Sequence, residues 1–199
     1  MSVRIIAGKY KGLSLAVPAS IRPTLSRYRQ SLFDILELMS TDKTGFFVGK
    51  TVLDCFAGSG AFGIEALSRG ADYAYFVDSD RKAIALINAN LKKLKIENSS
   101  SVICSDARSL KKKYRLKRFA TLPSVDLAFL DPPYGKESIS ATLKHLLQTE
   151  WILGSSMVIT EESTKKTEFL NEYFEITSRT YGDTTFKVWR HNINSFVNM

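Results

Sequence analysis

The chain has few of the residues that build a metal site or a disulfide scaffold. Its 199 residues include two cysteines and two histidines. His145 and His191 lie far apart and have no cysteine partners, so their spacing assembles no zinc site, and we expect no metal. Cys55 and Cys104 each end a predicted strand in apolar surroundings. We therefore expect two reduced, buried thiols in a cytoplasmic protein.

Long hydrophobic runs are also missing. Apolar stretches such as Leu127 to Leu130 are far too short to cross a bilayer, and the first residues lack the apolar segment of a secretory signal. We expect a soluble protein with no membrane partner. Because 44% of the residues are hydrophobic, the chain can still bury a sizeable core, which argues against a disordered or collagen-like chain.

Acidic residues are absent from two segments that carry the positive charge. The chain has 28 lysines and arginines against 20 acidic residues, a net charge of +8. Residues 1–33 contain six basic residues and residues 108–118 contain seven, which leaves −5 for the remainder. A polyanionic partner such as nucleic acid is therefore plausible, and it would meet these segments rather than the mildly acidic body.

The hydrophobic pattern predicts an N-terminal unit, residues 1–40, followed by an alternating α/β domain, residues 41–199. In the first unit, the runs 4–7 and 13–17 predict a hairpin, and apolar residues at helical spacing predict a helix over 26–39. The second unit alternates strands and helices, which is typical of a parallel sheet. We expect strands at 51–55, 73–77, 102–104, 125–130 and 157–160, helices at 61–69, 81–95 and 138–148, and a C-terminal antiparallel hairpin at 173–178 and 184–189.

A glycine-rich turn follows the first strand of the second unit. Without β-carbons at Gly58 and Gly60, the backbone can approach a ligand closely. The spacing of these glycines with Gly63 fits a dinucleotide site, but a carboxylate at Asp54 would repel a pyrophosphate. It suits a ligand that carries ammonium or sulfonium groups, and S-adenosylmethionine carries both and no phosphate.

Acidic residues also follow the next two strands. Asp78 lies about where nucleotide-binding α/β folds place the residue that hydrogen-bonds ribose hydroxyls. Asp80 is expected to cap the following helix. Asp106 follows the third strand, where it accepts either from an adenine amino group or from a helix N-terminus, and both interpretations stay open.

The segment Asp131-Pro132-Pro133-Tyr134 lies at the carboxyl end of the fourth strand, where ligand sites of doubly wound sheets form. The Asp131 carboxylate and the Pro132 carbonyl can accept both hydrogens of an exocyclic amine, which would orient the amine for attack. Tyr134 can stack on the planar ring that bears this amine. The segment therefore predicts an amine-modifying site.

Together these motifs resemble the S-adenosylmethionine-dependent amino-methyltransferases and, over nearly the whole length, the RsmD family of 16S ribosomal RNA (guanine-N2)-methyltransferases. The resemblance rests on Arg4 to Gly12, on Arg22-Pro23-Thr24 with Arg27, Arg29, Leu32 and Phe33, on Leu53 to Gly60 continuing through Glu65 to Arg69, and on Tyr181-Gly182. The family commonly has acidic residues where this chain has Ser26 and Gln30, and glutamate where it has Asp78.

The resemblance implies a Rossmann-like class I methyltransferase with a seven-stranded, mostly parallel sheet, a C-terminal antiparallel hairpin and the small N-terminal extension. It implies methylation of the exocyclic N2 amine of a guanine, with S-adenosyl-L-methionine as cofactor. The catalytic residues would be Asp131, Pro132, Pro133 and Tyr134. The cofactor would contact Asp54, Phe56, Ala57, Gly58, Ser59, Gly60, Asp78, Ser79, Asp106 and Ala107. The RNA would contact Arg4, Lys9, Lys11, Arg22, Thr24, Arg27 and Arg29.

The expected partner is 16S ribosomal RNA within a partly assembled small subunit, bound by a monomer. The basic run 108–118 is either a solvated segment or a second phosphate contact. Three alternatives stay open: an amino-methyltransferase acting on adenine or cytosine in nucleic acid or on protein glutamine, a NAD-dependent oxidoreductase, and a non-catalytic RNA-binding protein.

Overall fold

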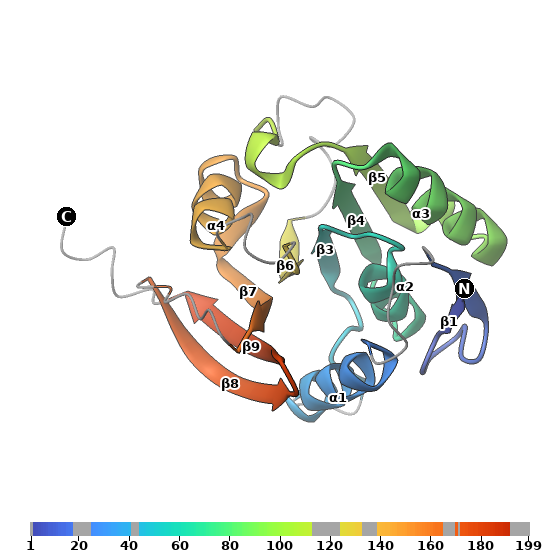
Figure 1. Cartoon of the computed structure of the whole chain (residues 1–199), viewed down its shortest axis with the longest axis horizontal. Helices are drawn as coiled ribbons and strands as arrows, with labels where there is room; N and C mark the ends of the chain where they lie inside the picture. The colour runs from blue at the N-terminus through green and yellow to red at the C-terminus, as the bar shows by residue number, and fades with distance from the viewer. Residues whose placement is uncertain are drawn as a thin grey trace.

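A seven-stranded sheet forms the centre of the protein (Figure 1). The computed structural model describes residues 2–17, 25–40, 44–112, 124–132, 139–164, 170 and 172–191. The strand order is β5-β4-β3-β6-β7-β9-β8, with the first five strands parallel and β9 antiparallel to both of its neighbours. The strands are β3 (Thr51–Cys55), β4 (Tyr73–Asp78), β5 (Ser100–Cys104), β6 (Val125–Leu130), β7 (Ile152–Ser163), β8 (Tyr173–Tyr181) and β9 (Thr184–His191). The predicted seven-stranded sheet with a C-terminal antiparallel hairpin is confirmed.

Both faces of the sheet are covered, which explains why β3 is buried at every position. Along β3, Val52 packs into one hydrophobic cluster with Phe76, whereas Leu53 packs into a second cluster with Tyr75 and Trp151. In the described part of the α/β domain the helices are α2 (Ala61–Ser68), α3 (Arg81–Leu94) and α4 (Ile139–Gln148), and the 3-10 helices η1 (Glu97–Ser99) and η2 (Ala107–Ser109) flank β5. Asp80 caps α3, as predicted, by accepting from the Lys82 N–H at 2.8 Å.

The chain reverses its direction across the sheet at β3. From β3 it proceeds through β4 to β5 on one side, and then crosses back to β6 on the other side. A crevice forms where the connections from two neighbouring parallel strands diverge in this way. The carboxyl ends of β3 and β6, whose last residues Cys55 and Leu130 are paired, therefore mark the place for a ligand.

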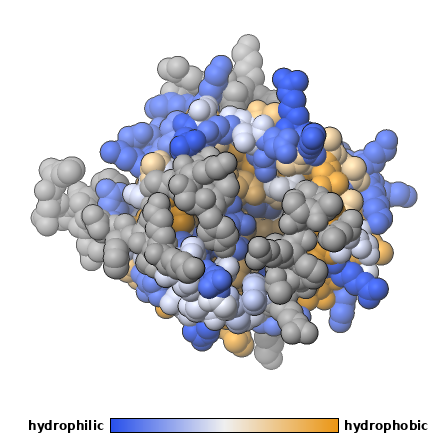
Figure 2. Space-filling view, in the orientation of Figure 1, coloured by the Kyte–Doolittle hydropathy of each residue, from blue (hydrophilic) through white to orange (hydrophobic). Residues whose placement is uncertain are grey.

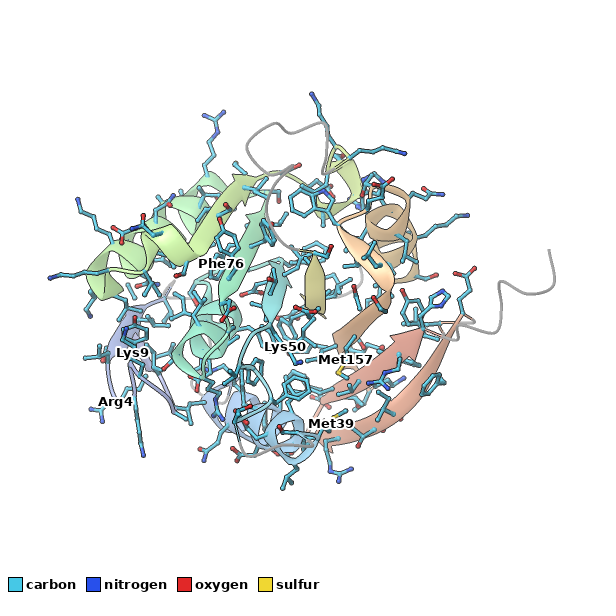
Figure 3. The ribbon with its side chains drawn as sticks, turned by 180° about the vertical axis from the view of Figure 1, so that it is seen from behind. Arg4, Lys9, Met39, Lys50, Phe76 and Met157 are labelled. Carbon is cyan, nitrogen blue, oxygen red and sulfur yellow. The ribbon has the colours of Figure 1, made fainter. Side chains whose placement is uncertain are left out.

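The N-terminal hairpin consists of β1 (Ser2–Arg4) and β2 (Ser14–Ala16), so its strands differ from the predicted runs. The reason is that Ile6 and Ala7 donate their N–H groups to the Glu65 carboxylate on α2, at 2.8 and 3.0 Å, instead of continuing the ladder. Figure 3 shows Arg4 and Lys9 on this hairpin at the periphery of the molecule.

Helix α1 (Leu25–Leu38) joins the N-terminal unit to the opposite end of the sheet. Its apolar side chains Leu32, Phe33 and Leu36 are buried in the main core cluster. Tyr28 stacks on Tyr181 at the end of β8, with ring centroids 5.2 Å apart. Consequently α1 contacts the C-terminal hairpin as well as the α/β domain.

Two expectations need correction. Cys104 is exposed, although Cys55 is buried as expected, because β5 is an edge strand of the sheet and its last residue has only one neighbouring strand. Strand β7 is also three times as long as the predicted run 157–160, because it pairs with β6 and then continues along β9 through Ser163.

On the face shown in Figure 2, hydrophilic residues dominate the outline, with hydrophobic ones between them.

Candidate active site

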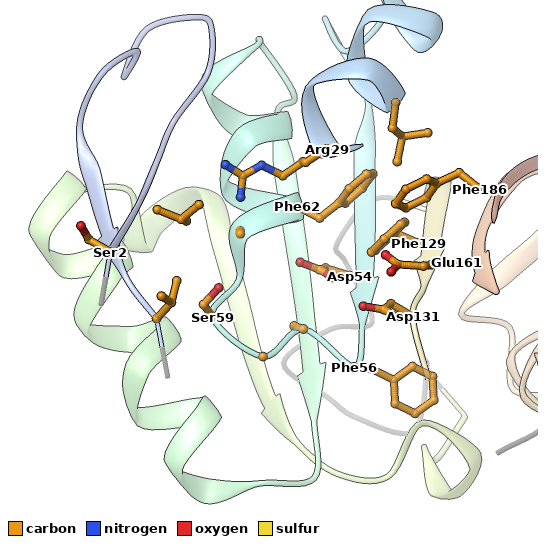
Figure 4. A pocket seen from close by; sticks show the side chains of 16 residues that line it. Ser2, Arg29, Asp54, Phe56, Ser59, Phe62, Phe129, Asp131, Glu161 and Phe186 are labelled. Atoms are coloured by element: carbon orange, nitrogen blue, oxygen red, sulfur yellow. The ribbon is translucent and has the colours of Figure 1, made fainter. Parts of the chain in front are cut away.

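A pocket of about 470 Å³ opens beside the carboxyl ends of β3 and β6 (Figure 4). Its volume is in the range of small-molecule sites. Residues of the β3–α2 loop line it together with Asp131 after β6, Glu161 on β7 and Phe186 on β9. Ser2, Val3 and Val17 of the hairpin and Arg29 and Leu32 of α1 complete the wall. The N-terminal unit is therefore part of the pocket.

The β3–α2 loop turns sharply under the pocket. Phe56, Gly58 and Gly60 have φ angles of 60°, 54° and 74°, in the left-handed region that favours glycine. The third glycine of the string has another function: a β-carbon on Gly63 would lie 2.4 Å from the Phe76 ring. Gly63 thus allows α2 to pack closely on β4, and only the loop before it is available to a ligand.

The Asp78 carboxylate holds this loop in place. Its Oδ2 accepts from the Gly58 N–H at 2.8 Å, and its Oδ1 accepts from the Asp80 N–H at the same distance. The next cofactor candidate, Ser79, is exposed. This arrangement leaves the Asp78 carboxylate at the carboxyl end of β4, beside the loop, with both oxygens already accepting one hydrogen bond.

Asp106 at the end of β5 caps the short helix η2. Its Oδ1 accepts from the Arg108 N–H at 2.8 Å, and its carboxylate pairs with the Arg108 guanidinium at 2.9 Å. Hydrogen bonds from Arg108 lower the pKa of Asp106. The sequence left two interpretations of Asp106 open, a helix cap and an adenine contact, and the structure shows the helix cap. Ala107, in contrast, is buried in the core.

Three acidic side chains gather on one side of the pocket (Figure 4). Asp54 is buried and accepts from the Gly63 N–H at 2.9 Å, yet its burial raises its pKa well above the ordinary value. Burial also raises the pKa of Asp131 to about 7. Leu130 on β6 pairs with Thr160 on β7, so the residues that follow them, Asp131 and Glu161, lie side by side. The pocket therefore favours a cationic or hydrogen-donating ligand on this side.

Glu161 was missed by the sequence interpretation. It is buried at the pocket, after an apolar run on β7. The signal was available, because two consecutive acids directly follow Met157–Thr160, a run that predicts a buried strand. Acids so placed are expected at a functional sheet edge.

Aromatic rings form the apolar part of the pocket. Phe62 and Phe129 stack with centroids 4.1 Å apart and planes 8° from parallel, and Phe186 lies near them in Figure 4. Phe56 lies on the other side of Asp131 in the same view. A planar ring bearing an amine can thus meet both apolar surface and carboxylates here.

The expected RNA-contacting residues fall into three groups. Arg4, Lys9 and Lys11 are exposed on the hairpin. Arg29 instead lines the pocket. Arg22 and Thr24 lie outside the described residues, and of Arg27 only the backbone, within α1, is described.

Two of the four catalytic candidates, Pro133 and Tyr134, also lie outside the described residues, as do residues 113–118 of the basic run. Pro132 is described and buried.

Within the part of the chain that the structure describes, no group of three or more histidines, cysteines or acids is arranged to hold a metal ion. None of the described helices is long and apolar enough to span a membrane.

The strand order, the glycine turn after β3 and the pocket at the reversal point define a Rossmann-like class I methyltransferase. A candidate methyltransferase from Escherichia coli, yhhF, superposes with a TM-score of 0.78 at 28% identity, over 96% of this chain and 99% of that one. The tRNA (uracil-54, C5)-methyltransferase of Pyrococcus abyssi shares the fold, with a TM-score of 0.65 at 16% identity over 95% of this chain and 43% of that one.

The model of the family described as "Conserved hypothetical protein 95" matches residues 3–190. The ribosomal RNA small subunit methyltransferase D of Escherichia coli strain K12 is 35% identical over 161 residues, which cover 80% of this chain and 74% of that protein. The chain belongs to this family, the RsmD family of methyltransferases. The resemblance and the enzyme class expected from the sequence are confirmed, so the oxidoreductase and non-catalytic alternatives are set aside.

Proposed function

We propose that this methyltransferase transfers a methyl group from S-adenosylmethionine to the exocyclic N2 amine of a guanine in 16S ribosomal RNA. The observation that carries the proposal is the pocket in which the β3–α2 loop meets Asp131. It is supported by relatives named ribosomal RNA small subunit methyltransferase D, in Escherichia coli and, at 29% identity over 95% of this chain and 94% of the relative, in Haemophilus influenzae.

The residues present fit this cofactor. The pocket gathers Asp54, Asp131 and Glu161, and burial raises the pKa values of the first two. The ammonium and sulfonium groups of S-adenosylmethionine supply compensating positive charge. Of the residues assigned to the cofactor, Asp54, Phe56, Ala57, Gly58 and Ser59 line the pocket, Gly60 caps α2 beside it, and Asp78, Ser79, Asp106 and Ala107 lie at the ends of β4 and β5.

In this arrangement the residues at the ends of β4 and β5 would hold the adenosine end of S-adenosylmethionine. Asp78 would accept from the ribose hydroxyls with its remaining lone pairs, as carboxylates at this position do in nucleotide-binding folds. Asp106, held in place by Arg108, would accept from the adenine amino group. Asp54, which lines the pocket, would then lie at the methionine end.

The chain's own contribution to the reaction is to orient the amine. The Asp131 carboxylate and the Pro132 carbonyl would each accept one N–H of the guanine amine, which turns its lone pair towards the methyl group. When bound, the cofactor supplies that methyl group on a positively charged sulfur. After transfer the nitrogen carries an extra proton, which Asp131 can accept because a carboxylate is a far stronger base than an arylamine nitrogen. Tyr134 is assigned to stack on the guanine ring.

For RNA docking we assign residues 1–40 to the RNA and residues 41–199 to catalysis. Exposed Arg4, Lys9 and Lys11 would contact phosphates, together with Arg22, Thr24 and Arg27. The target amine has to be unstacked, so we infer that a partly assembled small subunit in the cytoplasm is the substrate, bound by a monomer.

A transfer assay with tritiated S-adenosylmethionine tests this function. Four substrates are compared: immature small-subunit particles lacking the modification, protein-free 16S RNA, duplex DNA and a ribosomal protein mixture. We expect label in the particles above all. Label in DNA or protein alone would show that the chemistry serves another substrate, such as adenine, cytosine or glutamine, and would contradict the proposal.

A further inference from the structure

Arg29 lies in the pocket wall. From α1 its Nη2 donates to the Arg4 carbonyl oxygen on β1 at 2.7 Å. Its Nε is buried and has no hydrogen-bond partner among the described residues. Burial lowers the pKa of this guanidinium, so its surroundings do not fully compensate the charge. An incompletely paired, half-buried cation beside a cavity calls for an anionic ligand.

The carboxylate of Glu65 does not fill this need. Glu65 favours the charged form of Arg29 from a distance, but its oxygens accept from the N–H groups of Ile6 and Ala7 and from Arg69 Nε, at 2.8, 3.0 and 2.9 Å. Arg69 also contacts Glu37 at 3.5 Å. Glu65 is thus committed to holding the hairpin and Arg69, and within the described part of the chain no carboxylate forms an ion pair with Arg29.

The pocket has charges of both signs at different places. Arg29 is the one basic side chain among the 16 lining residues, which include the acids Asp54, Asp131 and Glu161. Figure 4 shows the guanidinium set apart from these acids, towards the hairpin and above Ser59. A ligand that carries a carboxylate next to an ammonium group matches this division, and the amino-acid end of S-adenosylmethionine has both.

We propose that Arg29 binds the α-carboxylate of the methionine moiety of the cofactor, and that it is a cofactor-binding residue rather than a phosphate contact. This inference rests on the proposed cofactor. A guanidinium presents paired N–H groups that fit a carboxylate in two parallel hydrogen bonds. The hydrogen bond from Arg29 to the Arg4 carbonyl oxygen holds this guanidinium against β1. Asp54 and Asp131 remain for the cationic groups and the amine.

The test measures affinity by calorimetry for two ligands that differ only in the carboxylate. These are S-adenosylhomocysteine and its decarboxylated form, S-adenosyl-3-thiopropylamine. We expect the wild-type protein to prefer the first about 10- to 100-fold, as one charge-assisted carboxylate pair requires. Arg29→Met should lose most of this preference by weakening the first ligand alone, and Arg29→Lys should keep part of it.

Lys93→Met is the matched control. The exposed Lys93 of α3 donates to the Ser14 carbonyl on β2 at 2.7 Å, so it anchors the hairpin as Arg29 does but does not line the pocket. It should retain the full preference.

Several outcomes would overturn the inference. Equal weakening of both ligands by Arg29→Met, with unfolding temperatures checked in parallel, would make Arg29 a structural anchor. Unchanged affinity for S-adenosylhomocysteine with weaker RNA binding would make it a phosphate contact. Should the wild-type protein bind neither ligand, the proposed cofactor itself fails, whereas wild-type binding without a preference refutes only the role of Arg29.

Discussion

Replacing Asp131 by asparagine should stabilise the protein at alkaline pH. In the folded protein, burial raises the pKa of this carboxyl from 3.8 to about 7. The unfolded chain therefore binds fewer protons than the folded one between these values, so the wild-type protein loses stability as the pH rises through this window, and the loss is complete above about pH 7. Asparagine has no charge to bury and escapes this loss.

The magnitude follows from the size of the displacement. The shift of about three pKa units corresponds to a loss of ~4 kcal/mol in the free energy of unfolding at pH 8. At pH 5 the loss is already ~1.6 kcal/mol, the equivalent of about one pKa unit. Because the charges of Asp131 and Asp54 influence each other in the same buried region, ~4 kcal/mol is an upper limit for the contribution of Asp131 alone. The gain from Asp131→Asn should thus be larger at pH 8 than at pH 5 by roughly 2 kcal/mol, or about 4 to 8 °C in unfolding temperature for a chain of this size.

The assay is calorimetric unfolding of both proteins at pH 5 and pH 8 without cofactor. Asp80→Asn serves as control, because Asp80 is an exposed helix cap and asparagine caps equally well. It should change stability little at either pH. A gain from Asp131→Asn that is the same at both pH values, or a loss of stability at pH 8, would refute the reasoning that burial of this carboxylate is costly.

Three further predictions concern other parts of the molecule. Asp131→Ala should abolish methyl transfer while S-adenosylhomocysteine still binds in calorimetry; transfer near the wild-type rate would contradict its orienting role. Gly63→Ala should destabilise the fold by ~1–3 kcal/mol in denaturant titrations, because its β-carbon would lie 2.4 Å from the Phe76 ring, and an unchanged midpoint would show that this contact relaxes. Lys9→Ala and Lys11→Ala should each reduce the slope of log affinity for RNA against log salt concentration by about 1. RNA-binding titrations at several salt concentrations measure this slope, and an unaltered slope would remove these residues from the RNA interface.

The central strands could be predicted from the sequence because they are buried on both faces. Strands β3 and β6 begin and end at the predicted residues, since mostly apolar runs mark both of them. Prediction was weaker where strand partners decide the outcome. The extent of β7 depends on its pairing with β9, and the exposure of Cys104 depends on β5 being the edge.

The acidic part of the site was only partly visible in the sequence. Asp54 lies near the carboxyl end of β3 and Asp131 directly follows the neighbouring parallel strand β6, so their meeting could be inferred from strand alternation. Glu161 joins them only through the register of β7 against β6. The location of Arg29 inside the pocket depends on how α1 packs, which its polar neighbours in the sequence do not reveal. Similarly, the buried Phe46 and Phe47 lie between the predicted helix 26–39 and the predicted strand 51–55, where the sequence analysis expects no element.

The identity of the methylated product tests the central claim most directly. Immature small-subunit particles are incubated with the wild-type protein and S-adenosylmethionine, the 16S RNA is digested to nucleosides, and these are separated by mass spectrometry against standards. The account predicts N2-methylguanosine at one site per RNA, absent with Asp131→Ala. Methylation of adenine or cytosine instead, or no methylated nucleoside from particles that the protein binds, would contradict it.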